Sequence, residues 1–193
     1  MKRALLTLAL LAAPALTGAA LAQTAPATGT TGTNPASGQQ RTIEAITARS
    51  DRGFSIRVPA GWTPLKNVPD TDVAFAYRTV GALRPTVTVR TQDVEPSIKA
   101  TLADFRDLFA GQLVKDVPKL KMLGEKTIRV SGTPAILWTY TGDGEGGGVR
   151  WSQVFTLRNN RLYTVTLMTP NGAPADLIEA GREILNSFAL TGK

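Results

Sequence analysis

The chain of 193 residues contains no histidine and no cysteine. Without histidine it lacks the usual general base near neutral pH and the commonest side-chain ligand of transition metals. Without cysteine it has no thiol nucleophile, no disulfide and no thiolate ligand for an iron–sulfur cluster. These absences exclude serine–histidine and cysteine–histidine catalysis and histidine-ligated zinc, so the sequence favours a protein that is not an enzyme.

A long apolar run occurs at the beginning of the chain. Lys2-Arg3 precedes apolar residues 4–16 and a small-residue cleavage motif that ends at Ala22. This pattern predicts that residues 1–22 are a secretory signal peptide cleaved near Ala22, which places the protein outside the cell, in the periplasm or in the cell envelope. The apolar run is shorter than a spanning helix needs, so we expect no membrane span in the mature chain. A retained leader is the alternative.

The next segment, residues 23–40, is rich in Thr, Gly, Pro and Ala and almost free of large apolar side chains. Such a segment buries too little surface to offset the entropy of ordering, which predicts a disordered tether. Residues 41–190 then form one domain. The net charge of +7 favours an anionic neighbour, although a basic charge also serves solubility alone.

Period-two alternation predicts a β-rich domain. The clearest signal is a three-stranded meander over residues 135–141, 149–158 and 162–168, with a tight turn at Asn159-Asn160 between its last two strands. In the middle strand one face carries apolar residues and the other carries polar ones: Val149, Trp151, Phe155 and Leu157 against Arg150, Ser152, Thr156 and Arg158. Further strands are expected at residues 42–48, 53–58, 72–79, 85–91 and 126–131.

Two helices interrupt the strands. Thr101 and Asp104 form a capping-box pattern at the start of a helix that must end before Pro118. A second helix is expected to open at Pro174. Because no regular βαβ alternation occurs, the pattern predicts an α+β domain with an antiparallel sheet. Since nearly every strand has one polar face, periodicity alone favours two layers.

The segment Gly53-Phe-Ser-Ile-Arg-Val-Pro-Ala-Gly-Trp62 resembles the F-x-I-x-x-P-x-G-W opening of the PsbP-like family, the relatives of the extrinsic photosystem II protein. The middle helix, the meander and the closing helix that ends at Ile184-Leu-Asn-Ser-Phe188 are also similar to that family. The resemblance covers about residues 41–190. It implies an α/β/α sandwich with one helix on each sheet face, and it implies partner binding rather than catalysis. Because alternation favours two layers, we expect the family architecture with one sheet face incompletely covered. The family's histidine metal sites have no counterpart here.

The glycine-rich segment 142–148 contains two carboxylates, Asp143 and Glu145. It matches G-x-G-x-x-G, but a strand rather than a helix follows, and the carboxylates would repel a phosphate. The same carboxylates could contribute to a weak Ca²⁺ site, while a plain hairpin tip is the simpler interpretation. Apart from this weak calcium hypothesis, no cofactor is expected.

Basic residues gather near the end of the first helix and on the polar side of the meander. A partner-binding surface for an anionic protein or cell-envelope component is predicted from them: Lys119, Lys121, Arg150, Arg158 and Arg161. Interleaved exposed aromatics are not apparent, so nucleic acid is not an expected partner. The three tryptophans, Trp62, Trp138 and Trp151, are expected in the core.

Other catalytic arrangements have little support. Ser97 and Lys99 lack an established nucleophile–base geometry, and the pairs Asp70–Asp72 and Asp104–Asp107 lack an apolar pocket to separate their pKa values. The sequence therefore predicts an exported, non-enzymatic domain that binds a protein or envelope partner. The alternative is a small-ligand or calcium-binding protein that uses a helix–sheet pocket or the acidic glycine loop.

Overall fold

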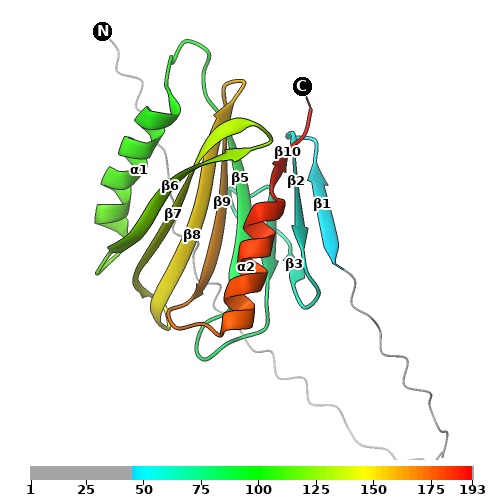
Figure 1. The fold of residues 1–193 in the computed structure, drawn as a ribbon, viewed down its shortest axis with the longest axis vertical. Coiled ribbons are helices and arrows are strands. Elements are labelled where there is room, and N and C mark those ends of the chain that lie inside the picture. The colour runs from blue at the N-terminus through cyan, green and yellow to red at the C-terminus, as the bar shows by residue number, and fades with distance from the viewer. Residues whose placement is uncertain (1–44, 193) are drawn as a thin grey trace, which may run out of the picture.

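A computed structural model describes residues 45–192, which form two antiparallel sheets and two helices (Figure 1). The helices are α1 (Leu102–Asp116) and α2 (Ala175–Ser187). The small sheet has the order β1 (Ile46–Ser50), β2 (Phe54–Val58), β10 (Ala189–Leu190). The large sheet has the order β3 (Thr63–Leu65), β4 (Val73–Ala76), β5 (Thr86–Asp93), β9 (Arg161–Pro170), β8 (Gly147–Arg158), β7 (Thr133–Gly144), β6 (Lys121–Val130).

The predicted meander is confirmed as β7, β8 and β9, the central strands of the large sheet. Asn159 and Asn160 both have positive φ, 50° and 53°, which is the backbone of a two-residue hairpin turn. At the opposite end, β7 and β8 are joined through Glu145-Gly146, so most of the glycine-rich segment is strand rather than loop.

Helix α1 covers one face of the large sheet. Its capping box is confirmed, because Asp104 N–H donates to Thr101 Oγ1 at 3.2 Å and Thr101 N–H donates to Asp104 Oδ2 at 2.7 Å. Three residues at helical spacing then turn toward the sheet and are buried: Phe105, Phe109 and Leu113. They pack with the apolar residues of β7 and β8, including Trp138 and Phe155.

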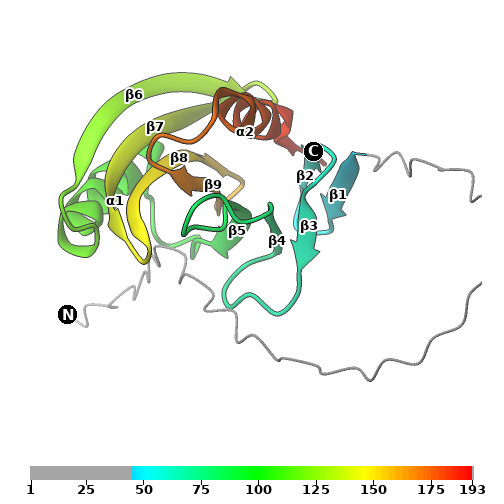
Figure 2. The ribbon, with the colours of Figure 1, turned by 90° about the horizontal axis from the view of Figure 1, so that it is seen from below.

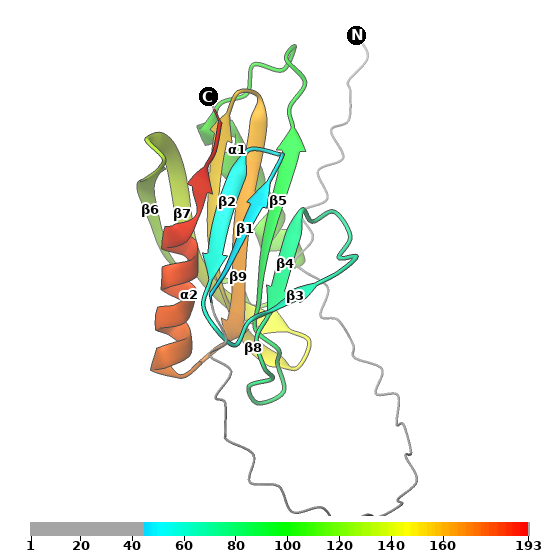
Figure 3. The ribbon, with the colours of Figure 1, turned by 90° about the vertical axis from the view of Figure 1, so that its right-hand side faces the viewer.

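The second face is covered by α2 together with the small sheet. Figure 3 shows β1 and β2 in front of β9 and α2 beside them, with α1 behind the large sheet, and Figure 2 shows the same layers from below. The core on this side joins Phe54 and Ile56 of β2 and Ile184 of α2 to Val154 and Val165 of the large sheet. The three-layer sandwich implied by the family resemblance is therefore confirmed, and the two-layer prediction from alternation is wrong.

The prediction of two layers failed because α2 and the small sheet cover only part of one face of β8. Arg150 and Ser152 are partly exposed on the α2 side, whereas Val154 and Thr156 on the same face are buried beneath the second layer. The prediction also missed that the strand at 53–58 belongs to a separate sheet.

Several strand limits differ from those expected. The strand predicted at 126–131 begins at Lys121, and the one predicted at 42–48 is observed as Ile46–Ser50, residues 42–44 lying outside the described residues. Pro174 caps α2 rather than opening it. Neither β3 nor β10 was predicted, because three and two residues are too short to show a period. The predicted leader 1–22 and tether 23–40 also lie outside the described part.

Two helical glycines have opposite surroundings, which leads to opposite expected mutational effects. A Cβ on Gly181 would lie 2.4 Å from Leu167 Cδ2, whereas a Cβ on Gly111 meets nothing within 4 Å. Gly111→Ala should therefore raise the free energy of unfolding by up to about 1 kcal/mol through helix propensity. Gly181→Ala should cancel that gain by overpacking, which typically costs about 1–3 kcal/mol. Urea unfolding measures both, and two equal gains would contradict the close packing of α2 on β9.

Candidate functional site

A hollow of about 390 Å³ opens where the β1–β2 turn, the β8–β9 turn and the C-terminal residues meet. We call it the arginine hollow, because three arginines line it. Its lining includes Arg52, Arg158, Arg161, Asp51, Asn159 and Gly192.

Local backbone conformation brings these elements together. Gly53 closes the β1–β2 turn with φ of 90°, a value that other residues rarely adopt, and its N–H donates to Ser50 O at 3.1 Å. Thr191 N–H donates to Gly53 O at 2.9 Å, which places the end of the chain against that turn. The hollow therefore depends on residues from both ends of the domain.

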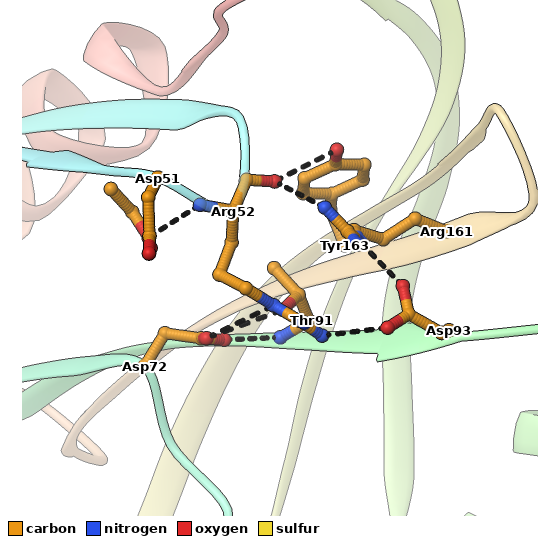
Figure 4. Close-up of polar contacts among 8 residues, drawn as sticks. Asp51, Arg52, Asp72, Thr91, Asp93, Arg161 and Tyr163 are labelled. Atoms are coloured by element: carbon orange, nitrogen blue, oxygen red, sulfur yellow. Dashed lines mark hydrogen bonds and ion pairs between the residues drawn. The ribbon is translucent and has the colours of Figure 1, made fainter.

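A network of charged side chains holds two of the arginines (Figure 4). Arg52 Nη2 and Arg161 Nε contact the two carboxylate oxygens of Asp93 at 3.1 Å and 2.5 Å. The hydrogen bond from Arg161 is the main reason why the pKa of Asp93 lies below its usual value. Asp72 accepts hydrogen bonds from Thr91 N–H at 2.5 Å and from the Thr91 hydroxyl at 3.2 Å, and it lies 3.8 Å from Arg52 Nε.

The same network joins the two sheets. Arg161 Nη1 donates to Arg52 O at 3.0 Å, and the hydroxyl of Tyr163 donates to the same oxygen at 3.2 Å. Both donors come from β9 and the acceptor from the β1–β2 turn. The guanidinium groups of Arg52 and Arg161 are therefore fixed in place before any ligand arrives.

Arg158 differs from the other two arginines of the hollow. It donates to Gly192 O and has no carboxylate partner among residues 45–192. It also lies directly opposite Arg161 in the β8–β9 register, where like charges are unfavourable. An anion bound in the arginine hollow would relieve this repulsion and receive charge-assisted hydrogen bonds.

The structure divides the predicted partner-binding residues between two places. Arg158 and Arg161 meet at the arginine hollow. Lys121 and Arg150 lie toward the opposite end of the sheet, where both pair in register with Thr141. Sequence reasoning missed Arg52, and the only available signal was its position before a turn glycine, which does not identify its distant partners.

The acidic glycine segment forms an ion pair of its own. Lys119 Nζ lies 2.7 Å from Asp143 Oδ2, and this contact raises the pKa of Lys119. Glu145 is in the two-residue turn. Within residues 45–192 no three acidic, histidine or cysteine side chains cluster as metal ligands would. The calcium hypothesis for Asp143 and Glu145 stays a prediction, in which a cation must compete with the Lys119 ammonium.

Other residues considered in the sequence analysis lie in the core, in the α1 cap or in a surface ion pair. Trp62, Trp138 and Trp151 are buried, as expected. Asp104 caps α1, and Asp107 contacts Arg106 at 2.9 Å. None of the helices between residues 45 and 192 is long and apolar enough to cross a bilayer.

Comparison with known proteins supports the fold. A family model described as PsbP-like protein matches residues 23–190, and no curated protein sequence matches the chain. The solution structure of cyanobacterial PsbP from Synechocystis sp. PCC 6803 has a TM-score of 0.58 at 14% identity and covers 80% of this chain and 97% of its own.

Two further solved structures share the fold, with similar TM-scores and sequence identities. LpqN, involved in cell envelope biogenesis of Mycobacterium tuberculosis, has a TM-score of 0.54 at 15% identity, with 77% and 91% of the two chains covered. The Ran-binding protein Mog1p of Saccharomyces cerevisiae has a TM-score of 0.55 at 14% identity, with 77% and 96% covered. At these identities the likeness concerns the fold alone.

Proposed function

The chain belongs to the PsbP-like protein family, and from this premise we propose that it is an exported, non-enzymatic domain whose arginine hollow binds an anionic group of a protein or cell-envelope partner. Two neighbours in fold, a Ran-binding protein and a protein involved in cell envelope biogenesis, are in keeping with such a role. Export rests on the signal-peptide pattern in residues 1–22.

The observation that carries this proposal is the state of Arg158. Arg158 lines the arginine hollow, and its guanidinium has a backbone carbonyl as partner, opposite a second arginine that is already held by Asp93. Such an arrangement leaves one guanidinium without a carboxylate partner beside donors that are held in position, and both features favour anion recognition.

The chemistry of the site favours binding over catalysis. The chain has no histidine or cysteine, and Asp93 and Asp72 of the network are engaged with arginines and with Thr91. Neither of these two carboxylates is a free general base, and Asp51, which also lines the hollow, accepts a hydrogen bond from the Ser50 hydroxyl at 3.4 Å.

Titration with citrate and with inorganic phosphate tests the proposal. The protein is purified from its own cells, where its intact mass also reports leader cleavage near Ala22. We expect the amide signals of Gly53, Asn159 and Gly192 to shift on titration. Arg158→Glu should weaken binding at least about tenfold, since one charge-assisted hydrogen bond contributes on the order of 1.5–3 kcal/mol.

Arg129→Glu is the matched control. Arg129 is exposed and likewise donates to a backbone carbonyl, Gly132 O at 2.7 Å, but it belongs to β6 and does not line the hollow. It should leave anion binding nearly unchanged. Equal weakening by both variants would show general charge attraction, and the absence of any shift would reject the hollow as an anion site.

A further inference from the structure

Strand β6 is a long outer edge of the large sheet. It pairs with β7 alone, so the backbone groups on its other side have no strand partner among residues 45–192. Residues 121–127 are all exposed (Figure 2 shows β6 at the rim of the curved sheet). An edge of this kind is a template for an added strand.

The charge on this edge is positive. Lys121 and Lys126 pair in register with Thr141 and Leu137, which are four residues apart in β7 and therefore on the same face, so the two lysine side chains share one sheet face. The one acidic residue of β6, Glu125, is already neutralised, because its two oxygens accept hydrogen bonds from Arg106 and Trp138 at 2.8 Å each.

Apolar surface accompanies the charge. Met122 and Leu123 are 42% and 46% exposed, beside the register shift between Met122 and Gly124. Lysines and bulges can also protect an edge from aggregation. Here, however, the register is regular from Gly124 to Val130, a length that matches an average strand of about five to six residues.

We propose that β6 is a docking edge for an extended acidic segment of a partner protein. The segment adds to the large sheet as a further strand, and its carboxylates lie over Lys121 and Lys126. A second copy of β6 fits less well, because it would add more lysines to this edge. This site is separate from the arginine hollow, and its test does not depend on anion binding there.

The test uses a synthetic peptide of alternating glutamate and valine, 10 residues long like β6 itself, so that it spans both Lys121 and Lys126. We expect it to slow hydrogen exchange of the backbone amides of residues 124–130. The double variant Lys121→Glu/Lys126→Glu should bind it at least about tenfold more weakly. The control is Lys66→Glu/Lys99→Glu, which makes the same change of net charge at two exposed lysines outside β6 and should bind like the original protein.

Three results would overturn the proposal. Equal weakening in both double variants would mean unspecific attraction. Protection of another edge, such as β1, would place the peptide elsewhere. Slower exchange in β6 at rising protein concentration without peptide would make a second copy the occupant. An alternating lysine–valine peptide should give no protection, since its charges match those of the edge.

Discussion

Phe155→Ala is expected to lower the free energy of unfolding by about 3–5 kcal/mol, the usual cost of emptying a fully buried phenylalanine site. Phe155 is 0% exposed and contacts both an α1 residue and a sheet residue edge-on. The ring centroids of Phe109 and Trp138 lie 5.2 Å and 5.0 Å from its own. Its removal therefore leaves a cavity between α1 and the large sheet. Urea unfolding measures the loss.

Two further variants test whether the loss of stability comes from the cavity at Phe155. Phe155→Leu refills part of the cavity and should lose less than Phe155→Ala. Leu157→Ala, two residues along the same face but only partly buried, should also cost less. A loss below about 1 kcal/mol for Phe155→Ala would mean that α1 does not pack on the sheet as described.

Gly142→Ala is expected to lower the free energy of unfolding by about 1–3 kcal/mol through overpacking. A Cβ at this position would lie 2.4 Å from Val117 Cγ1 and 2.8 Å from Pro118 O. The backbone oxygen cannot rotate away, because Asp143 N–H donates to it at 2.8 Å. The segment after α1 must therefore move, and thermal or urea unfolding will report the cost.

Gly124→Ala serves as the control for Gly142→Ala. Gly124 is also a strand glycine, but a Cβ there meets nothing within 4 Å and its φ is not positive. We expect a change within about 0.5 kcal/mol, as for ordinary surface substitutions. Similar losses at the two glycines would show that general strand effects, rather than the approach of Pro118, determine the outcome.

Sequence reasoning predicted those elements that are defined by a pattern within their own residues. The capping box at Thr101 and the buried spacing of Phe105, Phe109 and Leu113 defined α1. The two asparagines defined the β8–β9 turn. In each case the contacts that decide the structure are a few residues apart, so a local pattern is sufficient.

Features that depend on distant segments were not predicted. Alternation in β8 does not reveal that α2 and the small sheet cover Val154 and Thr156 but leave Arg150 partly exposed. The length of β6 was missed because a strand exposed on both faces shows no alternation. For the arginine hollow, Arg158 and Arg161 were predicted as partner-binding, whereas Arg52 meets them only through the tertiary fold.

The pairing of β10 with β2 influences the order in which the parts of the domain can fold. Leu190 pairs with Phe54, so the small sheet needs residues from near the beginning and near the end of the domain. A large loop must close before this contact forms, whereas the β7–β8–β9 meander needs only neighbouring residues. During synthesis the meander is free to fold first. The arginine hollow, which includes Gly192, is therefore assembled only after the C-terminal residues have joined the small sheet.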